Sequence, residues 1–337
     1  MPSFKNRVYG CAVIKSVNSN YNADFSHQPR TLPDGRVYAT DKALKYSVKN
    51  YFKKLYPEEK VFYFKKLNEE FNPMSLIEAY ADMFPDHVEL KDEKKVDKVK
   101  VPKAGVAKDI LECIDIRLFG ATFALKAAKK EDNVAISVHG PVQINHGINI
   151  WPENNIYSEQ IMSPFRNPGD GSSDDEDKAA TTLGRQSKLR EGHYLHHFSV
   201  NPQNLVDIVK LAGDGAKTIS ESDIKKLKEA FSKGVTYYDS SAKAGTDNEL
   251  LIWVQLKEKS KTVLPNFTEL VSINRENGTV EFDLSKINSL VQKYGNSEIE
   301  SVEVYYSPET TLVNGLNPSE LVKHVDLETG KDMNSDG

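Results

Sequence analysis

The chain of 337 residues is long enough for one large domain with insertions or for two modest domains. Its 39% hydrophobic and 28% charged residues are typical of a folded protein and exclude fibrous or broadly disordered classes. No run approaches the roughly 20 apolar residues needed to span a bilayer, and residues 1–15 lack the apolar stretch of a signal peptide. We therefore expect a cytoplasmic protein with no membrane partner.

The two cysteines, Cys11 and Cys113, are each flanked by apolar residues. This context favours reduced thiols in a core over a disulfide framework or a zinc site. No phosphate-binding loop or glycine-rich nucleotide motif is found in the sequence. We predict neither a metal site nor a cofactor.

Charge is unevenly distributed along the chain, although the formal net charge is only -5. Residues 41–66 contain eight lysines and three acids, and residues 91–108 contain seven lysines and three acids. Residues 170–177 contain five acids and no base. This segregation favours a polyanion-binding face on an otherwise acidic body, with ordinary solvated lysines as the alternative.

The first predicted elements are a strand, a loop and an amphipathic helix. Residues 7–17 are rich in β-branched and apolar residues, which predicts a buried strand, and residues 18–38 form a polar loop. Thr40 is a plausible N-cap for a helix that ends near residue 55. Opposite its apolar stripe, the helical spacing predicts a face of four lysines: Lys42, Lys45, Lys49 and Lys53.

Two irregular segments interrupt the predicted strands that follow. Residues 56–108 are aromatic and Lys/Glu-rich with weak periodicity, which we interpret as an inserted subdomain. Residues 111–119 and 134–144 have strand character, and so do residues 192–200. Residues 151–190, which lie between the last two of these strands, are too long for a passive loop. Their length indicates a functional protrusion, and we expect its acidic tip to be disordered.

The last third of the chain predicts a second helix and an αβ appendix. Ser220 and Asp223 resemble a capping box, and residues 250–256 form a fully buried strand. Asn277 and Gly278 predict a hairpin turn, followed by a helix that stops at Gly295 and a final strand over residues 298–306. The polar tail over residues 328–337 is expected to be disordered.

Without the two insertions, the predicted elements follow one another along the chain as strand, helix, strand, strand, helix, strand. This is the ferredoxin-like order, found in RNA-recognition domains, and it predicts an α+β fold. Fold alone does not establish function.

Several strings of residues resemble the backbone subunit of the CRISPR Cascade surveillance complex, a branch of the RAMP superfamily, and most closely its type I-B form. DIRLFGATFA at 115–124 followed by HGPVQINHGINI at 139–150 resembles the family's paired central strands. TDKALKYSVKNY at 40–51 resembles its lysine-bearing first helix, and TISESDIKKLKEAF at 218–231 resembles its second helix. The resemblance covers roughly residues 5–257.

This resemblance implies a hand-shaped subunit with an RRM-like palm, fingers and a thumb. The palm would comprise residues 1–55, 109–150 and 191–327, the inserted fingers 56–108, and the thumb 151–190. Such subunits polymerise along CRISPR RNA (crRNA) without cutting it and present the guide for pairing with target DNA. The implied partners are crRNA, target DNA through the guide, further copies head to tail, and four other Cascade subunits: the guide-processing endonuclease, the handle-binding subunit, and the large and small subunits.

Candidate RNA-contacting residues follow from the matched motifs. Lys42, Lys45 and Lys49 match the backbone-binding helix, and Gln143 with His146 matches the strand facing the guide. The family's asparagine-rich first loop reads NSNYNAD at 18–24, which offers Asn18, Asn20 and Asn22. In its predicted strand, Arg117 would either reach RNA or pair with Asp115. The protrusion also contains apolar and cationic side chains that would wedge between bases or stack on them. These are Met162, Phe165 and Arg166.

The sequence is also compatible with two other functional classes. The first is a RAMP-type endoribonuclease that processes guide or cleaves target RNA through Asp24 or His146; the competing interpretation of Asp24 is a solvated turn residue. The second is a basic protein-interaction module. His193, His196 and His197 do not predict a metal site, because strand alternation sends His196 and His197 to opposite faces. The separated charges also suggest that the acidic tract of one copy meets lysines of the next.

Overall fold

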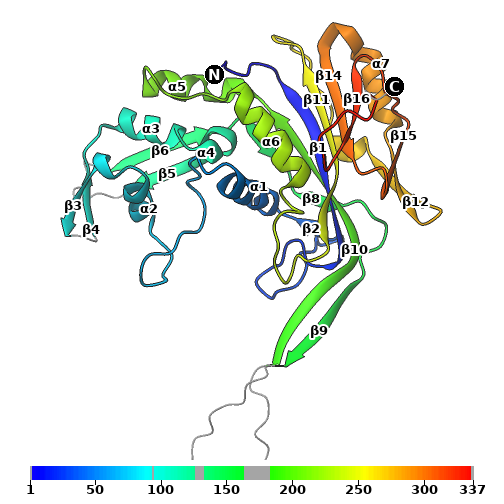
Figure 1. The fold of residues 1–337 in the computed structure, drawn as a ribbon, viewed down its shortest axis with the longest axis horizontal. Helices are drawn as coiled ribbons and strands as arrows, with labels where there is room; N and C mark the ends of the chain where they lie inside the picture. The colour runs from blue at the N-terminus through cyan, green and yellow to red at the C-terminus, as the bar shows by residue number, and fades with distance from the viewer. Residues whose placement is uncertain (1, 93–94, 126–132, 163–182, 335–337) are drawn as a thin grey trace, which may run out of the picture.

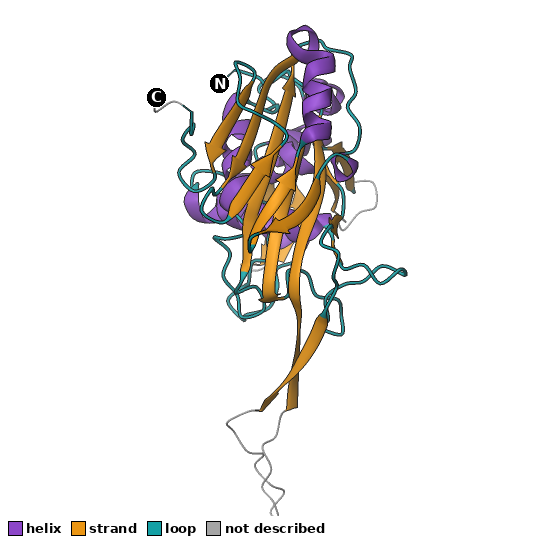
Figure 2. Ribbon diagram, turned by 90° about the vertical axis from the view of Figure 1, so that its right-hand side faces the viewer, coloured by secondary structure: helices purple, strands orange, loops and turns teal. Residues whose placement is uncertain are grey.

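The computed structural model describes residues 2–92, 95–125, 133–162 and 183–334. Its centre is a large mixed sheet with helices on both sides, from which a long β-ribbon projects (Figures 1 and 2). The predicted α+β class is confirmed. No helix in the described ranges is long and apolar enough to cross a membrane.

Strand β1 (Val8–Ser19) lies at the middle of this sheet, antiparallel to β10 (Leu183–Val200) on one side and β11 (Thr246–Leu256) on the other. Beyond β10 lie the short strands β7 (Val142–Ile144), β8 (Gly147–Asn149) and β2 (Tyr38–Ala39). Beyond β11 lie β14 (Ile299–Tyr306) and β16 (Val322–Asp326). The four strands at the centre of the sheet lie side by side in the order β11-β1-β10-β8.

Helices α1 (Asp41–Leu55) and α6 (Glu221–Lys233) cover one face of the sheet (Figure 1). Ala12 and Ile14 of β1 point into this core, as period-two alternation requires. The predicted capping box at α6 is present: the Ser220 hydroxyl accepts from the Asp223 amide, and the Asp223 carboxylate accepts from the Ser220 amide. Thr40 is the N-cap of α1, but its own amide and hydroxyl donate to the Asn22 side chain.

The C-terminal third of the chain covers the opposite face of the sheet. Cys11 and Val13 of β1 pack there against Phe267, Phe282 and Ile287. The elements on this side include the predicted Asn277-Gly278 hairpin; they are η4 (Phe267–Glu269), β12 (Ser272–Glu276), β13 (Thr279–Asp283), α7 (Ser285–Glu298) and β15 (Thr311–Asn314). The predicted appendix is therefore a second layer over the sheet, so the centre of neither face is free to carry a ligand.

The predicted strand over residues 111–119 is wrong. Helix α3 (Lys103–Leu111) ends at its start, and the remainder forms helix α4 (Ile114–Phe119). Nonlocal contacts decide this conformation: the Asp115 carboxylate accepts the amides of Phe62 and Tyr63. Gly120, at φ 74°, ends the helix in a backbone conformation that favours glycine.

The predicted strand over residues 134–144 is divided in two. Residues Val134–His139 form β6, which pairs with β5 (Gly120–Leu125) in a separate hairpin, and only β7 joins the main sheet. The division falls at Gly140, where a Cβ atom would lie 2.1 Å from the carbonyl carbon of Phe119. This close backbone approach explains why a glycine occupies the position between the two sheets.

The remaining elements belong to the inserted segment and to the stretch before α6. The insert contains α2 (Leu76–Met83), η1 (Pro85–His87), β3 (Val88–Asp92) and β4 (Lys95–Val99). After β10 come η3 (Pro202–Leu205) and α5 (Val206–Ala212).

The protrusion is a β-ribbon in which β9 (Ile156–Met162) pairs with the outer half of β10 (Figure 2). Because β10 runs continuously from the sheet into this ribbon, the ribbon is anchored in the core at Leu195 and Phe198. Met162 pairs with Leu183 at the last described position of the ribbon. Phe165, Arg166 and the acidic tract lie outside the described residues.

The C-terminal tail differs from the prediction. Residues 328–334, expected to be disordered, form a turn against β16: the Met333 amide donates to the His324 carbonyl, and the Asp326 amide donates to the Lys331 carbonyl. The Asp326 carboxylate also accepts from the Thr329 amide and hydroxyl. Composition suggested disorder, but these hydrogen bonds attach the tail to the edge of the sheet.

Candidate nucleic-acid interface

The lysine face of α1 is only partly free. Lys42 and Lys53 are exposed, whereas the Lys45 ammonium lies 2.8 Å from the Asp41 carboxylate. The Lys49 ammonium donates to the Tyr63 carbonyl at 2.7 Å, and burial lowers the pKa of Lys49. The helix thus offers an exposed lysine near each end, with two lysines between them bound to the protein itself.

The β7–β8 segment lies beside the N-terminal end of α1. His146 Nδ1 is 3.9 Å from Asp41 Oδ1, and the exposed imidazole lies against the Tyr38 ring with centroids 5.4 Å apart. Gln143 is exposed and donates to the Gly140 carbonyl at 2.7 Å. Gly140 packs on Phe119, whose ring lies 5.6 Å from the Lys45 ammonium. We call the surface formed by Tyr38, Lys42, Lys45, Gln143 and His146 the α1 strip.

The pKa of Asp41, inside the strip, lies below its usual value. Burial alone would raise this pKa, but the hydrogen bond from Lys45 and the nearby charges of Lys45, His146 and Lys42 outweigh it. The carboxylate is therefore ionised at neutral pH. The strip carries one negative charge among its cations and aromatic rings.

Buried His196 fixes the segment that carries His146. Its ring lies between the Asn145 carbonyl, 3.0 Å from Nδ1, and the Tyr21 hydroxyl, 3.3 Å from Nε2. Burial lowers the pKa of His196 to about 4, so the imidazole is neutral at pH 7. A Cβ atom at Gly147 would lie 2.4 Å from Nε2, which explains the glycine that follows His146.

Two of the asparagines named from the sequence lie near the base of the ribbon. Asn18 is exposed and its side-chain oxygen accepts from the Tyr157 hydroxyl of β9 at 3.1 Å. Asn20 is buried, and its amide donates to the carbonyls of His27 and Ser187. Asn18 is accessible to a ligand, whereas Asn20 connects the first loop to β10.

Arg117 is buried inside the fold and does not lie on the surface. The side chain is 3% exposed, and its guanidinium donates to Asp223 at 2.8 Å, to Glu59 at 3.4 Å and to the carbonyls of Leu111 and Glu112. The predicted pairing with Asp115 is wrong, because α4 replaces the expected strand. Contact between Arg117 and RNA is incompatible with this burial.

The residues considered for catalysis have partners within the fold. The Asp24 carboxylate accepts from the Ser26 hydroxyl, the Ser26 amide and the Gln28 amide, and these hydrogen bonds lower its pKa. His193 is buried with Nδ1 2.5 Å from Glu249. His197 stacks on Phe267 on the opposite side of the sheet from His196, as strand alternation predicted. Asp24 therefore has the geometry of a turn-capping residue.

A group of aromatic side chains that no sequence pattern predicted lies beside α1. Tyr46 of α1 stacks on Phe64 with centroids 5.0 Å apart, and the Lys53 ammonium lies 4.8 Å from the Phe64 centroid. Tyr238 contacts Tyr46 edge-on, and Lys243 lies over the Tyr238 ring at 5.0 Å. These residues are distant in sequence, so no spacing pattern connects them.

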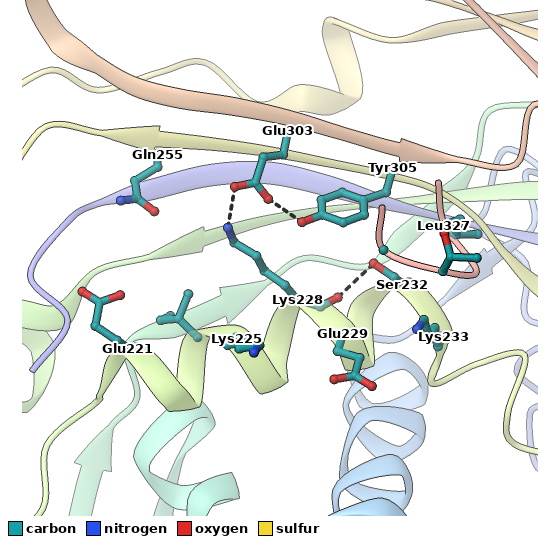
Figure 3. Close-up of a pocket in the computed structure, with 13 residues that line it drawn as sticks. Glu221, Lys225, Lys228, Glu229, Ser232, Lys233, Gln255, Glu303, Tyr305 and Leu327 are labelled. Carbon is teal, nitrogen blue, oxygen red and sulfur yellow. Dashed lines mark hydrogen bonds and ion pairs between the residues drawn. The ribbon is translucent and has the colours of Figure 1, made fainter. Parts of the chain in front are cut away.

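A separate groove of about 560 Å³ lies between α6, β14 and the C-terminal turn (Figure 3). Acids match its lysines: Lys228 pairs with Glu303 at 2.7 Å, and the Tyr305 hydroxyl donates to the same carboxylate. Figure 3 shows Glu221 and Glu229 on the α6 wall of the groove beside Lys225 and Lys233. This balance of charge does not favour a polyanion.

Comparison with known proteins finds relatives by fold and by family. A chain of a structure titled "CRISPR RNA-guided surveillance complex, pre-nicking" is similar with a TM-score of 0.51 and 12% identity, over 95% of this chain and 96% of that one. A second, from a "CRISPR RNA-guided surveillance complex", has a TM-score of 0.44 and 11% identity, over 91% and 95%. No curated protein matches the sequence.

The family comparison covers most of the chain. The model of the family described as CRISPR-associated protein Cas7 matches residues 6–299, which include the inserted segment, the ribbon, most of the C-terminal layer and the central sheet except β14 and β16. The likeness of the first solved structure agrees with this match at the level of fold. The chain belongs to the CRISPR-associated protein Cas7 family.

Proposed function

We propose that this protein is a crRNA-binding backbone subunit of a type I-B Cascade surveillance complex. Copies of the chain polymerise along the guide and present its bases for pairing with target DNA. The observation that carries this proposal is the α1 strip, in which the charges of Lys42, Lys45 and His146 surround Asp41 at the surface of a chain of the Cas7 family.

The chemistry of the strip suits a guide holder. A subunit that serves many guides must bind phosphate and sugar while leaving the base edges free, and lysine contacts to phosphate carry no sequence information. Lys42 is exposed, and Lys45 is held at the same end of the helix. Each phosphate that such a lysine neutralises releases counterions, which makes binding sensitive to salt.

The proposal assigns the parts of the fold to the hand-shaped subunit implied by the resemblance. In this proposal the main sheet with α1 and α6 is the palm, residues 56–108 are the fingers, and the ribbon at 151–190 is the thumb. The ribbon extends well beyond the sheet (Figure 2), which suits a thumb that crosses the guide toward the next subunit. Met162, Phe165 and Arg166 are the proposed residues that displace bases.

We further propose that the subunit does not cut RNA. The competing function was an endoribonuclease using Asp24 or His146. Asp24 accepts three hydrogen bonds within its own turn, and the His146 ring lies tilted against the Tyr38 ring. These contacts support a structural role for Asp24 and a binding role for His146.

RNA binding with a salt series tests this function. The purified full-length chain is titrated into two fluorescein-labelled single-stranded RNAs of equal length and unrelated sequence, and fluorescence anisotropy is read at several salt concentrations. We expect equal affinity for both sequences, a steep loss of affinity with salt, and intact RNA on a denaturing gel with or without Mg²⁺. Cleavage of the RNA, or no binding at low salt, would overturn the proposal.

A further inference from the structure

Lys243 lies in the loop between α6 and β11, and its ammonium faces two tyrosine rings. It is 5.4 Å from the Tyr21 ring centroid and 5.0 Å from the Tyr238 centroid. Within the described part of the chain, this ammonium has no ion pair and no hydrogen-bond acceptor. Burial lowers the pKa of Lys243 to about 8.

This environment is incomplete for a charged amine. A ring face attracts a cation but provides no lone pair in the direction of an N–H bond, whereas an ammonium has three N–H donors to satisfy. A partly desolvated ammonium without acceptors is costly, and an anion supplied from outside removes that cost. Asp239 and Asp247 each lie four positions from Lys243 in the sequence. Asp247 interacts with Lys15, and within the described residues neither acid forms an ion pair with Lys243.

The loop that carries Lys243 lies between α1 and the base of the ribbon. Its Ala242 carbonyl accepts from the Asn20 amide, and its Ser241 carbonyl accepts from the Gln186 side chain of β10. On the other side, Tyr238 lies edge-on to Tyr46 of α1, with ring centroids 5.2 Å apart. A chain of single-stranded nucleic acid passing from α1 to the ribbon therefore passes this loop.

We propose that Lys243 binds a phosphodiester group of single-stranded RNA between α1 and the ribbon, with Tyr21 and Tyr238 holding the ammonium in place. This inference rests on the proposed function and adds to it a phosphate contact outside α1. Phosphate supplies the acceptor oxygens that the two rings do not. The alternative anion, a carboxylate of a second copy, is an outcome of the test.

The test is the pH dependence of RNA binding in the wild type, Lys243→Arg and Lys243→Gln. The probe is a fluorescein-labelled oligouridine about 30 nucleotides long, read by anisotropy at constant ionic strength from about pH 7 to pH 9.5. Bound phosphate favours the charged amine, so the pKa of Lys243 is higher in the complex than in the free protein. Affinity is then complete below the free pKa and falls as pH rises above it, at most about tenfold per pH unit.

We expect the wild type to lose affinity above pH 8 more steeply than Lys243→Arg, because arginine stays charged across this range. We expect Lys243→Gln to bind roughly 5-fold to 10-fold more weakly than the wild type at about pH 7, with the shallower pH profile of the arginine variant. Lys243→Arg, which keeps the cation, should retain most of the affinity at that pH. Thermal unfolding of all three proteins checks that each one is folded.

The possible failures are distinguishable. If all three proteins bind RNA with equal affinity and equal pH profiles, the Lys243 inference is wrong and the proposed function stands. If Lys243→Gln keeps its RNA affinity but loses self-association in the absence of RNA, the anion belongs to a second copy and the inference is again wrong. If the wild type binds no RNA at low salt, the proposed function itself fails.

Discussion

The Lys45 ammonium lies 2.8 Å from the Asp41 carboxylate, one turn earlier on α1. The same carboxylate is 3.9 Å from His146 Nδ1 across the gap to the β7–β8 segment. Asp41 thus holds two of the residues that the sequence assigned to RNA binding. This carboxylate orders the strip and, at the same time, reduces its positive potential.

Asp41→Asn should increase RNA affinity by roughly 3-fold to 10-fold, since a single charge near a phosphate is worth on the order of 1 kcal/mol in a partly exposed site. The low pKa of Asp41 means that the substitution removes a full charge at pH 7. Anisotropy with a labelled RNA at fixed salt measures the change. Asp34→Asn, which removes an exposed acid paired with Arg36, is the matched control. Weaker binding by Asp41→Asn would contradict the assignment of the strip.

Lys42→Ala should reduce the slope of log affinity against log salt by a little under one, because one phosphate contact is lost. Affinity should fall for unrelated RNA sequences alike, as expected for a contact that reads no base. Lys210→Ala, an exposed lysine on α5, serves as the control and should leave the slope unchanged. Equal effects of the two substitutions would show that the α1 strip is not a specific surface.

Arg117→Ala should destabilise the fold by about 3–5 kcal/mol, because it leaves the buried Asp223 carboxylate without its partner. Arg117→Lys should also destabilise, since an ammonium cannot make the five donor contacts of the guanidinium. Urea unfolding followed by circular dichroism measures both effects. A loss of RNA affinity in Arg117→Lys without loss of stability is the result that this structural role does not allow.

His196 should make the protein less stable in mild acid. Its pKa is about 4 in the fold and near 6.5 in the unfolded chain, so the unfolded state binds more protons between these values. The stability contributed by neutral His196 is complete above pH 6.5 and is lost as pH falls toward 4, by on the order of 3 kcal/mol. In His196→Asn, unfolding free energy should change less with pH over this window. Identical pH profiles for the variant and the wild type would rule out the assigned role.

Elements with local signals were predictable from the sequence. The capping box of α6, the Asn277-Gly278 hairpin and the strand that became β1 depend on neighbours within a few residues. The α1 helix was also predicted, but two of its four lysines proved to be partnered within the fold, because helical spacing shows a face and not what packs on it.

Elements fixed by distant contacts were not predictable. The apolar and β-branched residues around Arg117 favoured a strand. In the structure Arg117 lies in helix α4, from which it pairs with Asp223, 106 positions away in the sequence. Lys243 stood alone in its loop in the sequence, and only the fold brings Tyr21 and Tyr238 to it. The residues that carry the Lys243 proposal therefore came from three-dimensional contacts and not from motifs.

The measurement that most directly tests the central claim is size-exclusion chromatography with static light scattering of the full chain, mixed with single-stranded RNAs of increasing length. We expect masses that rise in whole multiples of the subunit as the RNA lengthens. The assemblies should dissociate as the salt concentration increases, and the RNA should stay intact. A mass that stays at one subunit for every RNA length would contradict a backbone subunit that polymerises along its guide.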